Sequence, residues 1–396
     1  MKSAKKSYLK RNTEYNLHIL TEALAEFDEE RKAACSNFLI DTARQLNSVQ
    51  AQKFWKDFNK LFKKKTAQKI DPLFDENHTL LTKSDEIDSC LFSVFFEAKH
   101  LKDQDFDQAF YEEVNNIYTR IMNEELWEEN DEYVNKLNST ITKQELLKAI
   151  KCTAKSIDNF NFHQSMLKHL GNSALDMLVK IFNLTLKSHT WIWQSAEVIF
   201  LRKDGKDSYS KPGNYRPICI TSYIGKLLEA IISRRLEIYL QETNQIDPNQ
   251  EGFSRSRNTI RYLNHLHLGI LADKEKNLSI LCLFIDFEKA FDSVWKRGLI
   301  IKLNKLGISG DVLHLIDSFL FTRKVKLNIN GNIGEERQCA EYGLPQGSVM
   351  SPVLFKIYLT DLLFELMDKE NISIFKFADD GTIKYPQRTQ KPVLKS

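Results

Sequence analysis

Apolar side chains recur three and four residues apart through much of the first 195 residues, a spacing that predicts a mostly helical region. The clearest stretches cover residues 17–46, 54–62, 142–150 and 174–186. The second stretch carries several aromatic side chains on one face, as expected of a helix that packs against a core. The Asp71-Pro72 dipeptide that follows it predicts a break in the helix.

The pattern changes after Trp191, where shorter apolar runs alternate with helical stretches. We predict strands over residues 197–201, 279–286, 325–329 and 372–377, and helices over residues 218–240 and 294–321. The run at residues 279–286 is almost continuously apolar, which is typical of a strand covered on both faces. Turn signals follow two of the strands, at Asn330-Gly331 and at the Asp-Asp-Gly sequence of residues 379–381. The chain is therefore expected to have an α+β fold.

The composition is that of a globular protein, because 42% of the 396 residues are hydrophobic, 28% are charged, and Gly and Pro number only 14 and 8. This length is sufficient for two or three domains. No apolar run approaches the roughly 18 residues that a membrane span needs, and none follows the basic N-terminus, so we expect neither a membrane span nor a secretory signal. The six cysteines are scattered singly, which is typical of a reducing compartment and predicts neither a disulfide framework nor a zinc site.

Charge is distributed unevenly, although the formal net charge is only +3. Residues 101–132 contain eleven acidic and two basic side chains, whereas residues 202–261 contain eleven basic and seven acidic ones. The acidic stretch cannot itself bind nucleic acid, and we interpret it as either a solvated helix or a mobile linker. The basic stretch includes a polar loop rich in lysine and is the better candidate for contact with phosphate groups.

Two predicted strands end in carboxylates, which are the candidate chemistry of the chain. Asp286 ends the first strand, and Asp379 and Asp380 follow the second. Adjacent acids repel one another unless a positive charge lies between them, and Mg²⁺ is held by a few carboxylates together with substrate phosphates. Two such ions would activate a 3′-hydroxyl group and stabilise a leaving pyrophosphate. The alternative is a solvated turn without a ligand, and an isolated Asp-Asp-Gly sequence does not distinguish the two.

Five short motifs include or precede these carboxylates. They are Tyr-Arg-Pro-Ile at residues 215–218, Gln-Glu-Gly-Phe at 250–253, Ile-Asp-Phe-x-Lys-Ala-Phe-Asp at 285–292, Gly-Leu-Pro-Gln-Gly-Ser-x-x-Ser-Pro at 343–352 and Phe-Ala-Asp-Asp at 377–380. In order and spacing they resemble the reverse transcriptase of non-LTR retrotransposons of the LINE or jockey type. The resemblance is strong over residues 197–385. Residues 1–195 resemble, more loosely, the segment that joins the endonuclease to the polymerase in such elements.

The resemblance implies an RNA-directed DNA polymerase. Asp286 and Asp379 match the family's metal-binding catalytic carboxylates, and Asp380 is the second acid of the turn and a further candidate for both roles. The implied cofactor is Mg²⁺, with Mn²⁺ as an alternative. Arg216 resembles the residue that grips the triphosphate, since a guanidinium fork suits phosphate oxygens. Lys203 is a second candidate for that role, with a solvated surface lysine as the alternative.

The same resemblance assigns residues around the nucleotide and the template. Phe291 matches the aromatic side chain that excludes a ribose 2′-hydroxyl group, with ordinary core packing as the alternative. Gln346 and Gly347 lie in a loop that supports template and incoming nucleotide, where Gln346 can hydrogen-bond either one and glycine permits close approach of the backbone. Arg255 and Arg257 are expected to contact the template backbone.

The implied architecture is a right-hand polymerase. Residues 1–195 would form a mostly helical N-terminal extension or linker, residues 196–279 the fingers and residues 280–396 a partial palm. Compared with the family, the chain is expected to be truncated at both ends, without thumb or upstream endonuclease, and therefore to extend primers poorly by itself. Gly381 stands where the family more usually has Thr or Ser. Asp292 belongs to its motif without an assigned role, and a structural hydrogen bond is the favoured interpretation.

The expected partners are an RNA template, a DNA primer and deoxynucleoside triphosphates, in the cytoplasm or the nucleus; the oligomeric state is open. The alternative function is a catalytically inactive nucleic-acid-binding remnant or adaptor, with the acidic stretch as its docking surface. The intact motif residues favour the enzyme, whereas the missing thumb favours the remnant. A metal-dependent nuclease is disfavoured because no histidine pairs with acids at a suitable spacing.

Overall fold

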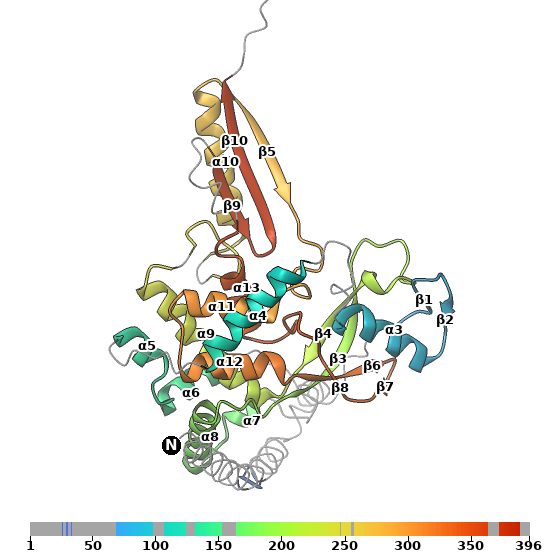
Figure 1. Cartoon of the computed structure of the whole chain (residues 1–396), viewed down its shortest axis with the longest axis vertical. Coiled ribbons are helices and arrows are strands. Elements are labelled where there is room, and N and C mark those ends of the chain that lie inside the picture. The colour runs from blue at the N-terminus through green and yellow to red at the C-terminus, as the bar shows by residue number, and fades with distance from the viewer. Residues whose placement is uncertain are drawn as a thin grey trace, which may run out of the picture.

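The structure of the chain, a computed structural model, combines a helical body and a twisted sheet with a projecting arm (Figure 1). It describes residues 69–97, 107–123, 131–152, 164–245, 247–254, 257–362 and 372–388, together with the helical residues 26, 29, 30 and 33. Apart from those four residues, the helices predicted over residues 17–46 and 54–62 lie outside the described residues.

Among the described elements, a run of helices, α3 to α8, precedes β3, and helices and strands are intermixed from there on. The helices are α3 (Ser84–Phe96), α4 (Gln108–Asn123), α5 (Glu132–Leu137), α6 (Lys143–Cys152), α7 (Gln164–Leu167), α8 (Asn172–Lys187), η2 (Pro212–Asn214), α9 (Tyr223–Glu242), α10 (Thr259–Glu275), α11 (Lys296–Lys305), α12 (Asp311–Phe321) and α13 (Ser351–Tyr358). The strands are β1 (Leu73–Phe74), β2 (Leu80–Leu81), β3 (Ser195–Arg202), β4 (Tyr215–Ile220), β5 (Leu278–Ile285), β6 (Lys324–Ile329), β7 (Asn332–Ile333), β8 (Arg337–Gln338), β9 (Ser373–Phe377) and β10 (Asp380–Arg388). The expected mixture of helices and strands is confirmed.

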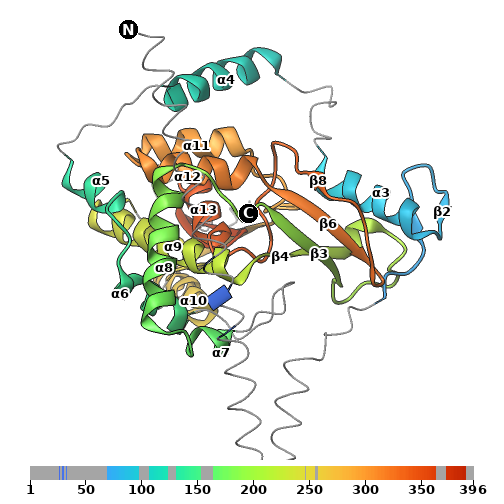
Figure 2. The same ribbon diagram turned by 90° about the horizontal axis from the view of Figure 1, so that it is seen from below.

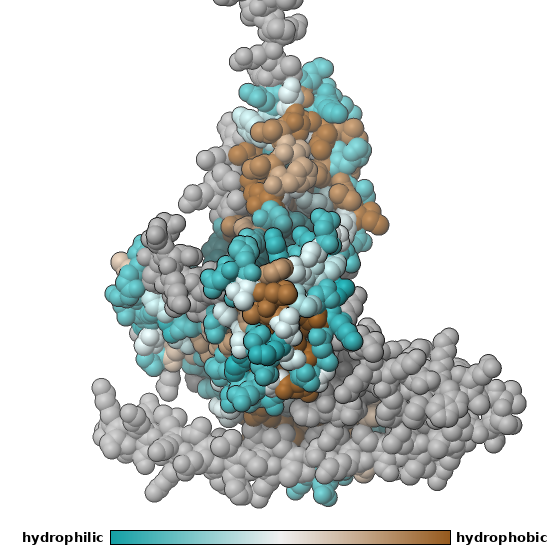
Figure 3. Space-filling view, turned by 90° about the vertical axis from the view of Figure 1, so that its right-hand side faces the viewer, coloured by the Kyte–Doolittle hydropathy of each residue, from teal (hydrophilic) through white to brown (hydrophobic). Residues whose placement is uncertain are grey.

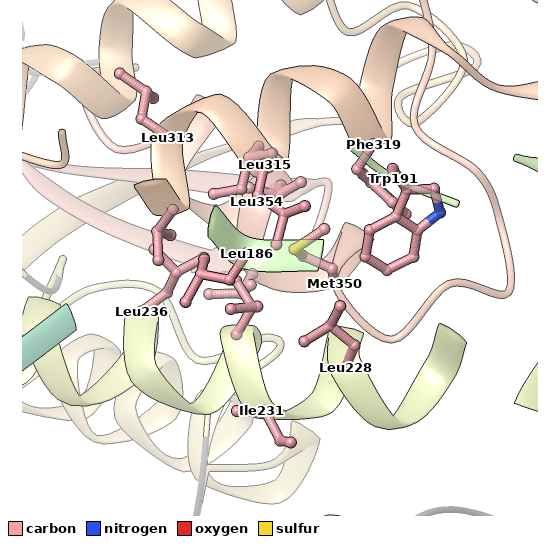
Figure 4. Close-up of a cluster of buried hydrophobic side chains, with 14 of the residues drawn as sticks. Leu186, Trp191, Leu228, Ile231, Leu236, Leu313, Leu315, Phe319, Met350 and Leu354 are labelled. Atoms are coloured by element: carbon pink, nitrogen blue, oxygen red, sulfur yellow. The ribbon is translucent and has the colours of Figure 1, made fainter. Parts of the chain in front are cut away.

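Most helices of the body surround one large apolar core. Helices α8, α9, α11, α12 and α13 supply most of its buried side chains. Figure 4 shows its centre, where Leu228 of α9 faces Met350 and Trp191 lies beside Phe319. The rings of Trp191 and Phe319 meet edge to face with their centroids 5.0 Å apart. This core fixes α9 and α13, the two helices that support the site described below.

A five-stranded sheet forms the other part of the body. Its strand order is β4-β3-β6-β7, with β8 also paired to β6; β3 runs antiparallel to β4 and parallel to β6. Alternate residues of β3 are buried, as the period of two for a strand requires: Ala196, Val198 and Phe200. The ring of Phe95 on α3 packs against Phe200, with the centroids 5.9 Å apart. The loop from β3 to β4 is the lysine-rich loop of the sequence.

The arm consists of α10 and a three-stranded antiparallel sheet in the order β5-β10-β9 (Figure 1). Helix α10 covers one face of this sheet. The hydroxyl groups of Tyr262 and Thr382 are hydrogen-bonded at 2.6 Å, and the ammonium group of Lys384 pairs with the carboxylate of Asp273. These buried polar contacts fix the helix on β10.

The expectation that residues 279–286 are covered on both faces is wrong. Leu281 and Leu283 of β5 are 66% and 55% exposed. They lie on the face of the sheet opposite α10, together with their ladder partners Tyr385 and Ile383. The upper part of Figure 3 shows this arm as an apolar surface patch. A continuous apolar run is typical of a doubly covered strand, but among the described residues only one face of this strand is covered.

Several predicted elements agree with the structure, and one begins later. The helices predicted over residues 142–150 and 174–186 correspond to α6 and α8. Thr142 and Glu145 cap α6 reciprocally: the Glu145 backbone N donates to Thr142 Oγ1 at 3.3 Å, and the Thr142 backbone N donates to Glu145 Oε2 at 2.9 Å. The helix predicted from residue 218 begins only at Tyr223, because the residues up to Ile220 pair with β3.

Helix α4 accounts for the middle of the acidic stretch. It lies across the outside of α11 (Figure 2) and buries Val114 and Ile121. Arg297 of α11 pairs with Glu341 and donates to the hydroxyl group of Tyr111 on α4 at 3.2 Å. This part of the stretch is therefore an amphipathic helix docked on the body rather than a linker.

No helix within the described ranges is both long and apolar enough to cross a bilayer. The cysteines of those ranges form no disulfide with one another: Cys90, Cys152, Cys219, Cys282 and Cys339.

Lys296, the first residue of α11, is a buried cation that makes stability depend on pH. The residue is 2% exposed, and its ammonium group donates to the carbonyl oxygen of Ala340. Burial lowers the pKa of Lys296 to about 8, and the nearby Arg323 guanidinium group lowers it as well. Because a lysine in the unfolded chain keeps its proton up to a pH of about 10, the unfolded state binds more protons above pH 8. The free energy of unfolding therefore rises as the pH rises from about 8 toward 10.

We expect this group to add about 1 kcal/mol to the free energy of unfolding between pH 7 and pH 9, a gain that Lys296→Met lacks. Urea denaturation of both proteins at the two pH values measures the effect. All other titrating groups are shared, so the difference between the proteins isolates Lys296. An identical pH dependence in the two proteins would show that burial does not lower the pKa of Lys296.

Candidate active site

Three carboxylates meet where the arm joins the body. The ladder between β5 and β10 ends with Ile285 opposite Gly381, so Asp286 and Asp380 follow at neighbouring positions of adjacent strands. Asp379 precedes Asp380 in the turn that joins β9 to β10. Asp286 and Asp380 are exposed, whereas Asp379 is half-buried. The structure thus brings together the three acids that the sequence singled out.

The turn itself lies one residue earlier than the Asp-Asp-Gly signal indicates. Its two residues are Ala378 and Asp379, and Asp380 and Gly381 already belong to β10. Ala378 has a φ of 56°, in the left-handed region that alanine seldom occupies. Such a conformation costs energy and persists only where surrounding contacts impose it.

Gln250 supplies those contacts through both ends of its side-chain amide. Its Oε1 accepts from the backbone N of Ala378 at 2.9 Å, and its Nε2 donates to the carbonyl oxygen of Ala378 at 3.1 Å. The same Oε1 accepts from the backbone N of Gly252 at 2.9 Å. Gly252 packs so closely that a Cβ there would lie 2.0 Å from the Ala378 N. The Gln-Glu-Gly-Phe motif therefore clamps the turn that carries Asp379.

Asp286 and Asp379 are close enough to Asp380 for their charges to act on it. Burial raises the pKa of Asp380, and the negative charges of Asp379 and Asp286 raise it further; no basic side chain is among the causes. Within the described ranges, no three Asp, Glu, His or Cys side chains form a ready-made metal group. The donor set nevertheless suits Mg²⁺, which takes one or two carboxylates and completes its coordination with phosphate and water oxygens.

The loop of residues 343–350 packs against the segment that follows Asp286. Its backbone N atoms at Gly343 and Leu344 donate to the carbonyl oxygens of Val294 and Phe291, both at 2.8 Å. Each of these bonds joins the loop to the chain a few residues beyond the carboxylate. The loop and the carboxylates therefore form one connected unit.

Gln346 and Asp292 are joined within this unit. Gln346 Nε2 donates to Asp292 Oδ1 at 2.9 Å. Burial raises the pKa of Asp292, and the hydrogen bond from Gln346 opposes that rise. Asp292 thus makes the structural hydrogen bond that the sequence favoured. One of the two N–H groups of the Gln346 amide is therefore engaged by the protein.

Gly347 lies directly against β4. Its φ is 107°, and a Cβ there would lie 2.7 Å from the carbonyl oxygen of Cys219. The Cys219 backbone N donates to the carbonyl oxygen of Gln346 at 2.7 Å. Both the conformation and the close approach require glycine at this position.

A basic group lies beside the loop. Burial lowers the pKa of Lys203, and the positive charges of Arg216, Lys206 and Lys289 lower it further, whereas Asp292 opposes them. Charges influence a pKa in this way only when they are near one another. Arg216 is exposed on β4 and Lys203 is half-buried. The structure therefore brings together both predicted phosphate contacts and adds two lysines to them.

Phe291 belongs to an aromatic cluster. Its ring stacks on Phe355 with the centroids 4.6 Å apart, and it meets Phe253 edge to face at 5.8 Å. The side chain packs against the large core and remains partly exposed. At least one face of the Phe291 ring is therefore packed against the core, as the alternative to a role in excluding a ribose 2′-hydroxyl group predicts.

Arg257 braces the clamp. Its Nη1 donates to the carbonyl oxygens of Pro248 at 2.9 Å and Gln250 at 2.8 Å. This nitrogen is therefore committed to the protein rather than to a template phosphate. Arg255 lies outside the described residues.

Two residues of this site carried no role in the sequence interpretation. Gln250 and Lys289 were identified only as members of their motifs, at residues 250–253 and 285–292. A positive charge three residues after a candidate metal-binding carboxylate is a signal that points to phosphate. The clamp by Gln250 has no comparable signal, because its partner Ala378 is 128 residues away.

Comparisons with known proteins relate this part of the chain to reverse transcriptases. Residues 201–395 match the family model described as reverse transcriptase (RNA-dependent DNA polymerase). The chain is 30% identical over 253 residues to the probable RNA-directed DNA polymerase from transposon BS of Drosophila melanogaster. The matched region covers 62% of this chain and 28% of that protein. It is 29% identical over 223 residues to the RNA-directed DNA polymerase from mobile element jockey of the same species. That match covers 55% of this chain and 24% of the relative.

A third relative is the retrovirus-related Pol polyprotein from type-1 retrotransposable element R1 of Bradysia coprophila, 31% identical over 191 residues, or 48% of this chain and 18% of that protein. The chain spans about a quarter of the length of the first two relatives. Among solved structures, a partial Cas6-RT-Cas1–Cas2 complex is similar over 66% of this chain and 39% of that chain, with 18% identity and a TM-score of 0.35.

Proposed function

We propose, since residues 201–395 belong to the reverse transcriptase (RNA-dependent DNA polymerase) family, that this chain carries the polymerase active centre of a non-LTR retrotransposon. The reaction is transfer of a deoxynucleotide to a primer 3′-hydroxyl group, directed by an RNA template. The observation that carries the proposal is the meeting of Asp286, Asp379 and Asp380 at the ends of adjacent strands. In this assignment the sheet of the arm belongs to the palm, and the β3–β4 hairpin belongs to the fingers.

The carboxylates have the central role. The family generally uses divalent metal ions, which would acidify the 3′-hydroxyl group and neutralise charge on the phosphates. Asp286 and Asp379 would hold them, with Asp380 beside both. As the new bond to the α-phosphorus forms, the bond to the β-phosphate bridge breaks and pyrophosphate leaves. The clamp by Gln250 on Ala378 would keep the neighbouring Asp379 in place during this displacement.

The basic group and the loop bind the nucleotide. Arg216 and Lys203 contact the triphosphate, and Lys289 joins them from the segment after Asp286. Gly347 lets the backbone approach the nucleotide closely, and Gln346 supports the loop through Asp292. Phe291 limits the space beside the sugar with the part of its ring that the cluster leaves exposed.

The function is tested by addition of a single nucleotide to a radiolabelled primer annealed to an RNA or a DNA template. This assay needs one turnover and is independent of processive synthesis. We expect addition in the presence of Mg²⁺ and none in the presence of EDTA. Binding of primer–template without any addition would instead favour the inactive nucleic-acid-binding remnant.

Arg216→Ala is expected to weaken binding of the deoxynucleoside triphosphate about 10- to 100-fold, the equivalent of one lost hydrogen-bonded contact between charged groups. Affinity for the primer–template duplex should change less than about twofold, because the residue is assigned to the nucleotide. Titrations of nucleotide and of duplex in the single-addition assay measure both constants.

Lys211→Ala is the matched control, because Lys211 is an exposed basic residue in the same β3–β4 connection and is not one of the charges with the largest effects on the pKa of Lys203. It should leave nucleotide binding within about twofold. Equal losses of nucleotide and duplex affinity in Arg216→Ala would remove the role assigned to Arg216.

A further inference from the structure

Glu229, in the middle of α9, is a fully buried carboxylate that serves a single loop. The residue is 0% exposed. Its Oε2 accepts from the hydroxyl group of Ser348 and from the backbone N atoms of Val349 and Met350, the latter two at 2.7 and 3.3 Å. Its Oε1 is buried without a hydrogen-bond partner in the described structure. A buried carboxylate is costly unless donors compensate it, so these three bonds determine where it lies.

The bonds continue from Glu229 along the loop. Ser348 Oγ accepts from the backbone N atoms of Met350 at 3.1 Å and Ser351 at 3.3 Å. Ser351 Oγ donates to the carbonyl oxygen of Pro345 at 2.9 Å. These amides lie at the N-terminus of α13, where the helix dipole favours a negative charge. The position of Glu229 is therefore transmitted back to Pro345, the residue before Gln346.

The core fixes the same end of the loop. Figure 4 shows the side chain of Met350 in the apolar core beside Leu228, the residue that precedes Glu229 on α9. The opposite side of the loop meets the candidate active site through Gln346 and Gly347, which contact Asp292 and β4. Glu229 thus supports from behind the surface that faces the nucleotide.

We propose that Glu229 is a positioning residue for nucleotide binding, which sets the place of Gln346 and Gly347 without contacting the nucleotide itself. The inference rests on the proposed function, because it takes this loop as the support of the incoming nucleotide. A carboxylate suits the position because it only accepts, and each of its three partners donates to it. A glutamine would fit the space but has one carbonyl oxygen and no charge with which to hold the three donors.

Glu229→Gln is expected to weaken binding of the deoxynucleoside triphosphate about tenfold, because small displacements of a positioning element are costly. Duplex affinity and the rate of addition at saturating nucleotide should change less than about twofold. Amide hydrogen exchange of residues 345–350 should become faster, which reports the loop independently of activity. The measurements are nucleotide titrations of single addition and exchange detected by mass spectrometry.

Arg235→Met is the matched control, because Arg235 is a second buried charge on α9 whose partners lie elsewhere. It pairs with Glu145 and donates to the carbonyl oxygens of Leu137 and Ser139, none of which belongs to the loop. Its loss should lower stability without changing loop exchange or nucleotide affinity per folded molecule. If Glu229→Gln does not fold, Ser348→Ala removes one donor, and we expect it to weaken nucleotide binding about threefold.

The outcomes separate this inference from the proposed function. Failure of the unaltered chain to bind nucleotide in the presence of Mg²⁺ and primer–template would overturn the proposed function, and the inference with it. Normal binding by the unaltered chain, with unchanged affinity in Glu229→Gln or Ser348→Ala, would overturn the inference alone. Equal weakening by Glu229→Gln and Arg235→Met would do the same, because it would reveal only a general loss of stability.

Discussion

Replacing Asp379 by alanine is expected to lower the rate of single-nucleotide addition by about 10³-fold or more, the equivalent of about 4 kcal/mol of transition-state stabilisation. Asp379 lies in the β9–β10 turn, and its charge acts on the neighbouring Asp380. In the proposed site, its removal takes away one of the three carboxylates that would hold the metal ions. Single-turnover incorporation in Mg²⁺ measures the rate, and circular dichroism verifies the fold. Duplex affinity should be retained, because loss of a negative charge does not weaken binding of phosphate groups.

Glu288→Ala is the matched control for this experiment. Glu288 is an exposed carboxylate two residues after Asp286 and is not among the charges that shift the pKa of Asp380. The rate should stay within about threefold of that of the unaltered chain. A rate that survives Asp379→Ala would place the chemistry elsewhere, and similar losses in both variants would reveal a general charge effect rather than a metal-binding role.

The location of the carboxylates could be predicted from the sequence because each follows a distinct apolar strand. The pairing of those strands could not, since a register depends on which strands meet in space. The structure aligns β5 with β10 so that Asp286 and Asp380 become neighbours, although 94 positions separate them in the sequence. The sequence pattern therefore indicated which carboxylates are candidate metal ligands, and the pairing of β5 with β10 determines that they lie close together.

Local patterns were wrong where tertiary contacts override them. The apolar run of β5 predicted cover on both faces, whereas α10 covers one face and leaves Leu281 exposed. The Asp-Asp-Gly signal placed the turn at residues 379–381, one residue later than it begins, because Ala378 adopts the positive φ that the pattern assigns to glycine. An alanine can do so only because Gln250, far away in the sequence, bonds both its N–H and its carbonyl group. No local pattern contains that information.

The contribution of the clamp can be measured at Gly252, where we expect the second-largest effect. A Cβ at this position would lie 2.0 Å from the N and 2.7 Å from the Cα of Ala378. These are backbone atoms, so Gly252→Ala must displace either the turn or the segment that carries Gln250. Overpacking of this kind costs about 1–3 kcal/mol of stability. Because Asp379 is the next residue after Ala378, the rate of nucleotide addition per folded molecule should fall about 100-fold.

Gly213→Ala provides the control, since nothing lies within 4 Å of a Cβ at Gly213 and its φ is not in the left-handed region. Its stability should stay within about 0.5 kcal/mol of the unaltered chain, with an unchanged rate. Thermal denaturation and single-turnover incorporation, normalised to the folded fraction, distinguish the two effects in Gly252→Ala. If stability falls while the rate per folded molecule is preserved, the clamp supports the fold but does not position Asp379. If the rate falls with it, the close contact between Gly252 and Ala378 is part of the active centre, because the backbone of the turn cannot move without moving the carboxylate.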